Sequence, residues 1–174
     1  MIPAATVCWI TGLPASGKTT LAERVRERLP GAVVLDGDAL RPLLTGQGYG
    51  RADRDAFYEA VARLAALIAA QGIPVLVAAT AHARAHRDRA RALAPRFLEV
   101  HVRTPRDACE RRDAKGLYRR ALAGELTALP GVGVAYEPPE HPDVVAEGGL
   151  DEGAEAEIAR RLAPPMAAPR TREL

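Results

Sequence analysis

Residues 12–19 read GLPASGKT, which fits the pattern G-x-x-x-x-G-K-[ST] of a loop that binds the phosphates of a nucleotide. Gly12 and Gly17 permit the backbone to turn successive N–H groups toward phosphate oxygens, and a following helix adds its positive N-terminal end. We expect Lys18 to reach the β- and γ-phosphates and the Thr19 hydroxyl to ligate Mg²⁺. The predicted ATP contacts in this loop are Gly12, Leu13, Pro14, Ala15, Ser16, Gly17, Lys18, Thr19 and Thr20.

The remaining sequence indicates where the last phosphate goes. A GTPase needs a guanine-selecting N-K-x-D segment, and the sequence contains no Asn. A motor-type ATPase carries an acid at the end of its third or fourth strand to hold Mg²⁺, but the apolar run IPVLVAAT has none. The prediction is therefore transfer to a hydroxyl, as in a kinase.

Two acids and an arginine follow the second apolar run, in the segment VVLDGDALR. Asp36 and Asp38 lie at the predicted carboxyl edge of the sheet, where ligands bind in α/β proteins. One of them could accept the proton of the attacking hydroxyl or hold Mg²⁺ through water, and Arg41 could bind an anionic acceptor. The sequence also allows a purely structural role for Asp38, as the N-cap of the helix that begins at ALRPLL.

The elements that would position these residues follow from hydrophobic patterning. Apolar runs bounded by Gly, Pro or Asp predict strands at 6–11, 32–35, 73–79, 97–102 and 142–146. Stretches with helical periodicity lie between them, chiefly at 18–29, 52–71 and 84–94. This alternation predicts an α/β fold with a parallel five-stranded sheet flanked by helices.

Two of the predicted helices have distinct surfaces. The longest, at 52–71, places Phe57, Val61, Leu64, Ala65 and Ile68 on one apolar face. The helix at 84–94 is rich in arginine, and we expect its charges to face solvent.

The length of 174 residues suits one domain, which we place at 1–163. The stretch 113–140 is rich in Gly, Pro and Arg, and its length favours a mobile lid over a passive connector. The composition of 164–174 predicts a disordered tail.

Composition restricts the partners. The net charge of +2 arises from 24 basic and 22 acidic residues spread along the chain, which argues against binding of nucleic acid or membrane but leaves small anions as ligands. Cys8 and Cys109 are expected to be reduced thiols in a cytoplasmic protein. Among the basic residues only Lys18 and Lys115 are lysines, and both lie in candidate functional segments.

An ordered set of motifs resembles the adenylylsulfate (APS) kinases, which transfer the γ-phosphate of ATP to the 3′-hydroxyl of adenosine 5′-phosphosulfate to give PAPS. The motifs are GLPASGKTTLA, LDGDALR, GYGRADR, DRARAL, DAKGLYRRALAGEL and YEPPEHPD. The resemblance implies a P-loop kinase fold, Mg-ATP as donor, Asp38, Lys18 and Lys115 as catalytic residues, and a homodimer. It further implies that Arg112 lies near ATP, that Arg41 and Arg54 bind the phosphosulfate, and that Tyr49 stacks on the acceptor base.

The resemblance is weakest around the predicted acceptor pocket. Ala39 and Phe57 stand where the family has Asn, Ala79-Thr80-Ala81-His82 replaces its F-[IV]-S-P strand end, and Leu129 replaces an aromatic residue. The predicted acceptor contacts are Asp36, Arg41, Tyr49, Arg54, Phe57, Thr80, Ala81, His82, Lys115, Gly116, Leu117 and Leu129.

Three functions therefore stay open. The first is an APS kinase with a divergent acceptor pocket, and the second is a related kinase for another phosphate- or sulfate-bearing alcohol. The third is a nucleotide-binding module without turnover. The spacing of His82 and His86 also suits a metal ion, although the sequence offers no evident third ligand.

Overall fold

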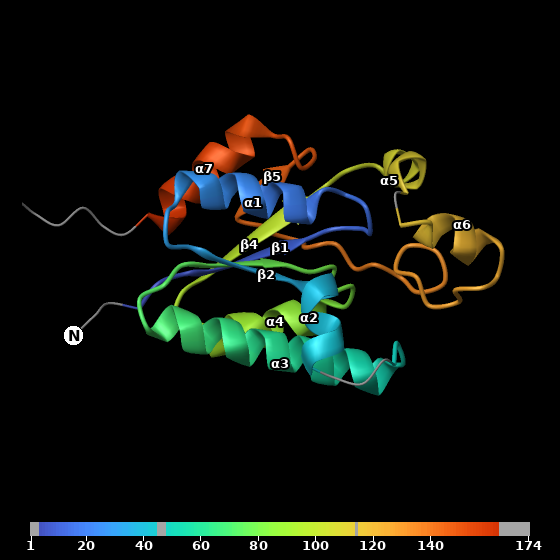
Figure 1. Ribbon diagram of the computed structural model, residues 1–174, viewed down its shortest axis with the longest axis horizontal. Helices are drawn as coiled ribbons and strands as arrows, with labels where there is room; N and C mark the ends of the chain where they lie inside the picture. The colour runs from blue at the N-terminus through green and yellow to red at the C-terminus, as the bar shows by residue number, and fades with distance from the viewer. Residues whose placement is uncertain (1–3, 45–47, 114, 164–174) are drawn as a thin grey trace, which may run out of the picture.

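A five-stranded parallel sheet forms the centre of the protein (Figure 1). The structure, a computed structural model, describes residues 4–44, 48–113 and 115–163. The strands lie in the order β2-β3-β1-β4-β5. They are β1 (Val7–Thr11), β2 (Val33–Asp36), β3 (Val75–Ala78), β4 (Phe97–Val102) and β5 (Val144–Ala146). All four strand pairings are parallel, which confirms the predicted sheet.

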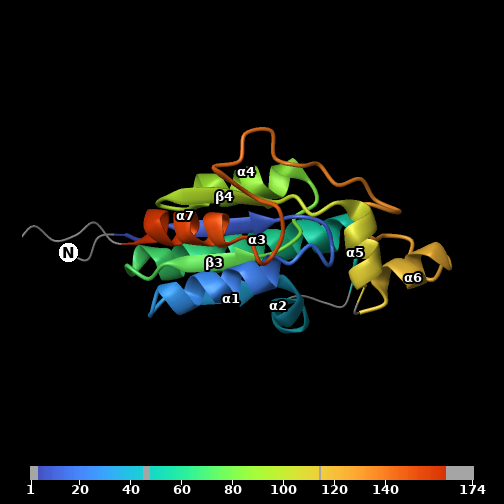
Figure 2. The same ribbon diagram turned by 90° about the horizontal axis from the view of Figure 1, so that it is seen from above.

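Helices cover both faces of the sheet. α1 (Lys18–Arg28) and α7 (Glu152–Leu162) lie on one face, and α3 (Arg51–Ala70) and α4 (Arg84–Leu93) lie on the other (Figure 1). The shorter helices α2 (Gly37–Leu44), α5 (Arg106–Arg112) and α6 (Leu117–Leu122) gather at the end of the sheet where the phosphate loop lies (Figures 1 and 2). Within the described ranges, no helix is both long and apolar enough to cross a membrane.

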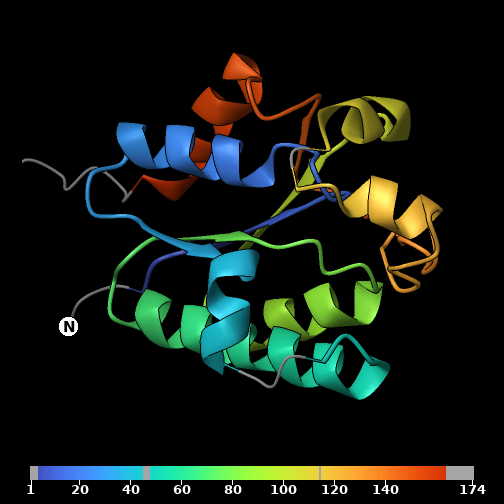
Figure 3. The ribbon, with the colours of Figure 1, turned by 45° about the vertical axis from the view of Figure 1, so that its right-hand side comes forward.

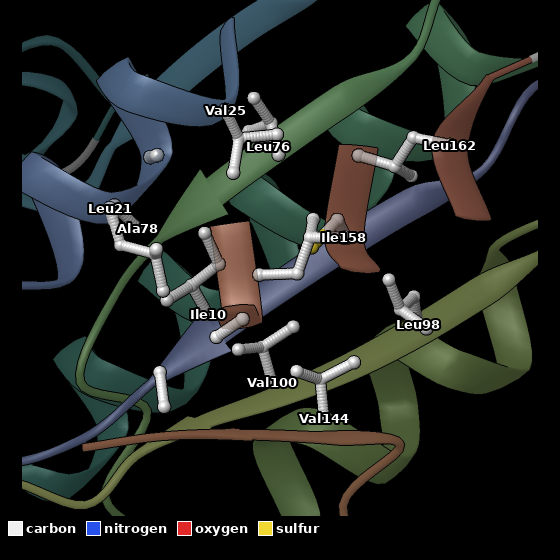
Figure 4. Close-up of a cluster of buried hydrophobic side chains, with 14 of the residues drawn as sticks. Ile10, Leu21, Val25, Leu76, Ala78, Leu98, Val100, Val144, Ile158 and Leu162 are labelled. Carbon is white, nitrogen blue, oxygen red and sulfur yellow. The ribbon is translucent and has the colours of Figure 1, made fainter. Parts of the chain in front are cut away.

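The two faces of the sheet bury separate hydrophobic clusters, because successive side chains of a strand point to opposite sides. In β1, Ile10 packs with Leu21 and Val25 of α1 and with Ile158 of α7 (Figure 4). Its neighbour Trp9 packs in the hydrophobic cluster on the other face of the sheet, together with side chains of α3 such as Val61. The alternation fixes which helix covers which face.

The apolar face predicted for the longest helix is the one that meets the sheet. Phe57, Val61 and Ala65 of α3 are buried, and Leu64 and Ile68 are partly buried against the same cluster. The helix thereby brings Arg54, one turn before Phe57, to the carboxyl end of β3.

The arginine-rich helix α4 is not solvated throughout, and the prediction is wrong for Arg87. This side chain is 1% exposed. Its guanidinium donates to Glu99 Oε1 at 2.8 Å, to the Ala81 carbonyl at 2.6 Å and to the Glu137 carbonyl at 2.7 Å. Burial is tolerated because an acid on β4 and two carbonyl oxygens satisfy the charge and its donors.

The stretch 113–140 includes α6 and contributes Tyr118 and Leu129 to a third hydrophobic cluster, which Cys109 of α5 completes and against which Leu13 packs. The segment therefore packs against α5 and the phosphate loop through a small shared core. Its movement as a lid stays a prediction, and the predicted tail at 164–174 lies outside the described residues.

Candidate active site

The phosphate loop connects β1 to α1 and has a backbone that requires glycine. A side-chain carbon at Gly12 would lie 2.6 Å from the Val102 carbonyl oxygen, and Gly17 has a left-handed φ of 102°. Thr104 Oγ1, two residues after the end of β4, donates to the Ser16 carbonyl at 2.7 Å and so holds the loop in place. The loop is thus held open in front of the N-terminus of α1, as anion binding requires.

Lys18, the first residue of α1, reaches back across this loop. Its Nζ donates to the carbonyl oxygens of Gly12 at 3.0 Å and Leu13 at 2.7 Å. Burial lowers the pKa of Lys18 to about 8, against the opposing effect of the Asp38 and Asp36 carboxylates. The ammonium group therefore lies where phosphate oxygens would enter, and it loses its proton at a lower pH than an ordinary lysine does.

Asp36, at the end of β2, makes contacts with both α1 and α2. Its Oδ2 accepts from Thr19 Oγ1 at 2.5 Å, and its Oδ1 accepts from the backbone amides of Asp38 at 2.8 Å and Ala39 at 3.1 Å. The capping role that the sequence allowed for Asp38 thus belongs to Asp36. The hydroxyl of Thr19 and the carboxylate of Asp36 form a pair of hard oxygen donors, which suits Mg²⁺ bound partly through water.

Asp38, in the first turn of α2, is free of capping and projects toward the lid segment. Its Oδ2 accepts a hydrogen bond from Lys115 Nζ at 2.6 Å. This hydrogen bond is the main cause of the raised pKa of Lys115. Both side chains are exposed in the cleft, so that an incoming substrate can reach them.

Arg41 lies one turn after Asp38, against two aromatic rings. Its guanidinium carbon is 3.9 Å from the ring centroid of Phe57 and 4.8 Å from that of Tyr49. Phe57 is only 1% exposed, whereas Tyr49 is 53% exposed. Phe57, a predicted acceptor contact, therefore lies beneath Arg41 and away from the cleft surface.

Arg54 connects α3, the end of β3 and the lid. It donates to the Ala128 carbonyl, and its Nη1 lies 3.5 Å from Nδ1 of His82. Burial lowers the pKa of Arg54, and burial together with the Arg54 charge lowers the pKa of His82 to about 4. His82 is therefore a neutral ring at pH 7 that can accept a hydrogen bond.

The described residues supply no third ligand that would complete a metal site with His82 and His86. His86 Nε2 lies 2.8 Å from Asp55 Oδ1, and the His82 and His86 rings meet edge to face at 5.3 Å. In the part of the chain that the structure describes, no group of three or more His, Cys, Asp or Glu side chains could hold a metal ion.

A cleft of about 1150 Å³ lies at the carboxyl edge of the sheet, and most of the predicted site residues line it. Sixteen predicted contacts line it: Pro14, Ala15, Gly17, Lys18, Thr19, Thr20, Asp36, Asp38, Arg41, Tyr49, Arg54, Thr80, Arg112, Lys115, Leu117 and Leu129. Seven do not: Gly12, Leu13, Ser16, Phe57, Ala81, His82 and Gly116. Of these, Ala81 is fully buried with a left-handed φ of 39°, and its amide donates to the hydroxyl of Tyr58 at 3.0 Å.

The lid segment is joined to the phosphate loop beside this cleft. Tyr118 of α6 is 1% exposed, and its hydroxyl donates to the Pro14 carbonyl at 3.0 Å. Asp113 accepts from the amides of Tyr118 and Arg119 and so caps α6. Lys115 lies two residues before α6, and the contact between Tyr118 and Pro14 therefore keeps Lys115 close to the phosphate loop.

Sequence reasoning missed the segment 147–151, which follows β5 and lines the cleft. A side-chain carbon at Gly149 would lie 2.6 Å from the Gly17 carbonyl oxygen and 2.9 Å from Thr20 Cβ. Asp151 caps α7 by accepting from the Ala154 amide and also accepts from the Glu147 amide, both at 3.0 Å. The sequence did offer a signal for this segment: Gly148 and Gly149 follow the predicted strand at 142–146, whose carboxyl end lies at the same edge of the sheet as the phosphate loop.

Comparisons with known proteins agree with this geometry. The family model described as adenylylsulphate kinase matches residues 4–147. The adenylyl-sulfate kinase of Rippkaea orientalis is 39% identical over 148 residues, 82% of this chain and 82% of that protein. That of Chloroflexus aurantiacus is 45% identical over 143 residues, 79% of this chain and 77% of that protein.

A solved structure gives the same result. The Mycobacterium tuberculosis APS kinase CysC in complex with AMPPNP and APS superposes with a TM-score of 0.83 at 38% sequence identity, covering 90% of this chain and 96% of that one. The fold, the cleft and these comparisons agree: the chain belongs to the adenylylsulfate kinase family.

Proposed function

We propose that this protein transfers the γ-phosphate of Mg-ATP to the 3′-hydroxyl of adenosine 5′-phosphosulfate, giving PAPS and ADP. The observation that carries the proposal is the position of Asp38. This carboxylate is released from helix capping by Asp36 and lies in one cleft with Lys18, Lys115, Arg41 and Arg54. A base, two ammonium groups and two guanidinium groups are what phosphoryl transfer to an anionic alcohol needs.

The donor is held by the phosphate loop. Backbone N–H groups of the loop and the N-terminus of α1 bind the phosphates of ATP, and Lys18 exchanges its two carbonyl partners for phosphate oxygens. Thr19 and Asp36 would hold Mg²⁺, which neutralises phosphate charge when bound. Arg112 and the segment 147–151 line the cleft beside the loop, and we assign them to the nucleoside part of ATP.

The acceptor approaches from the side of α2 and α3. Arg41 and Arg54 bind its anionic end, and Tyr49 and Leu129 provide apolar surface for its base. Asp38 takes the proton of the 3′-hydroxyl as that oxygen forms a bond to the γ-phosphorus. The bond from this phosphorus to the β-phosphate oxygen breaks, and the electron pair leaves with ADP.

Lys115 connects the lid to the reaction. In the structure its ammonium group is paired with Asp38, and substrate binding would place phosphoryl oxygens beside both. The lid also excludes water, which would otherwise compete with the alcohol for the phosphoryl group.

The test is formation of PAPS. The protein is incubated with Mg-ATP and APS, and PAPS and ADP are separated by chromatography, with 5′-AMP as an acceptor that lacks the sulfate. We expect PAPS and ADP in equal amounts. If no PAPS forms and ADP is released only when another sulfated or phosphorylated alcohol is added, the protein is a kinase whose acceptor is not APS. ATP binding without ADP release for any acceptor would support a module without turnover.

We further propose that the enzyme works in the cytoplasm as a homodimer. The two cysteines are buried free thiols, as expected for a reducing compartment. Light scattering should give twice the chain mass of 18.5 kDa, and a mass of one chain would contradict the dimer.

A further inference from the structure

Arg41 of α2 and Phe57 of α3 are in contact beneath the acceptor side of the cleft, with the guanidinium over the aromatic ring. The short helix α2, light blue in Figure 3, lies across the longer helix α3. The guanidinium carbon of Arg41 lies 3.9 Å above the ring centroid of Phe57. This is the geometry of a cation–π interaction, which is strongest when the pair is shielded from water.

Phe57 is buried beneath the cleft and does not form part of its surface. Its side chain is 1% exposed and does not line the cleft. Its ring also packs edge to face on Tyr58, with centroids 5.2 Å apart, and the Tyr58 hydroxyl is bonded to the Ala81 amide at 3.0 Å. An effect of Phe57 on substrate must therefore pass through a neighbour that lines the cleft, and of its neighbours Arg41 and Tyr58 only Arg41 carries a charge that can bind an anion.

Arg41 retains a donor without a partner. Its Nη1 atom is buried, and among the described residues nothing accepts a hydrogen bond from it. A buried donor of this kind is costly unless a ligand satisfies it, and an oxyanion is the best acceptor for a guanidinium. Arg41 lines the cleft together with Arg54, so that the unsatisfied donor lies beside a second positive charge.

We propose that Phe57 is a positioning residue, which holds the guanidinium of Arg41 in place, with Nη1 available, for the anionic end of the acceptor. This inference rests on the proposed function of the same cleft. Arginine has many rotamers in solution, and the two aromatic rings restrict Arg41 before the acceptor arrives. Preorganisation of this kind strengthens binding because less side-chain entropy is lost when the ligand binds.

The kinetic test is Phe57→Leu, which keeps an apolar side chain but removes the ring. We expect the KM for APS to rise about threefold to thirtyfold, the range set by typical cation–π strengths. The KM for ATP should change less than twofold. In protein that already carries Arg41→Met, Phe57→Leu should cause no further change in the KM for APS, because the guanidinium that Phe57 positions is absent.

Val61→Ala is the matched control. Val61 is equally buried, lies one turn further along the same face of α3, and has no aromatic ring with which to hold a guanidinium. It should lower the melting temperature without raising the KM for APS. An unchanged KM in Phe57→Leu, or an equal rise with and without Arg41, would overturn the inference.

A second measurement does not depend on the acceptor. Phe57→Leu, Arg41→Met and the double variant are unfolded in urea, and their unfolding constants form a double-mutant cycle. We expect a coupling of about twofold to tenfold between the two side chains. Wild-type protein that makes no PAPS would contradict the proposed function alone, whereas absent coupling would contradict the role of Phe57.

Discussion

The Nζ atom of Lys115 lies 2.6 Å from Oδ2 of Asp38, across 77 positions of sequence. One belongs to the lid segment and the other to the first turn of α2. The contact places an ammonium group on the carboxylate that we assign as the base, in front of the phosphate loop. An exposed ion pair of this kind contributes little stability, about 0–1 kcal/mol, so its place in the cleft points to function.

Asp38→Asn should lower kcat by about 10² or more, because an amide cannot accept the proton of the attacking hydroxyl. The dissociation constant for ATP should change less than twofold, since the phosphate loop is untouched. Steady-state kinetics and calorimetric titration with ATP measure the two quantities. Asp88→Asn, an exposed acid on α4, serves as control and should alter neither. Unchanged kcat would remove Asp38 from the proton transfer.

Lys115→Met should lower kcat by about 10² through loss of a positive charge near the transferred phosphoryl group. The melting temperature should stay within about 1 °C, because the pair with Asp38 is exposed. Arg111→Met removes a comparable exposed pair, with Asp107 at 2.7 Å, from outside the cleft. Equal kinetic effects of the two substitutions would show that the lid lysine has no special part in transfer.

Lys18 gives a pH prediction. Burial lowers its pKa to about 8, and ATP phosphates should raise that pKa because they favour the ammonium form. Above pH 8 binding must therefore take up a proton, and ATP affinity should fall as the pH rises, by at most about tenfold for each pH unit. Titration calorimetry at pH 8.5 in buffers of different ionisation enthalpy counts the protons. No uptake at pH 8.5 would mean that Lys18 keeps its proton in the free enzyme.

The sequence predicted those parts of the fold and site that local patterns determine. The sheet follows from apolar runs such as the one ending at Thr11, and the start of α1 from the loop that ends at Gly17. The apolar face of α3 follows from its spacing. Each of these depends on contacts that are close in sequence or repeated at a fixed period.

Features that depend on distant contacts were not predictable in the same way. Asp36, and not Asp38, caps α2 because β2 runs directly into that helix, a continuity that patterning alone does not reveal. Arg87 is buried because Glu99 of β4 and two carbonyl groups happen to surround it. Phe57 lies under Arg41 because α2 crosses α3. All three require the tertiary arrangement.

The close approach of Gly149 to Gly17 is another such feature, and it yields a prediction for the nucleotide side. A side-chain carbon at Gly149 would lie 2.6 Å from the Gly17 carbonyl and 2.9 Å from Thr20 Cβ, so that the segment 147–151 must move away from the phosphate loop. Gly149→Ala should therefore weaken ATP binding and lower the free energy of unfolding by about 1–3 kcal/mol, as overpacking typically does.

Gly153→Ala is the matched control for this substitution. Gly153 lies in the first turn of α7, and a side-chain carbon there would meet only Asp151 Oδ1, at 3.4 Å. Alanine at this helical position should stabilise the protein by about 0.5–1 kcal/mol and leave ATP binding unchanged. Urea unfolding and ATP titration measure both variants. If Gly149→Ala behaves like Gly153→Ala, the segment 147–151 can shift freely, and its contact with the loop does not contribute to the nucleotide site.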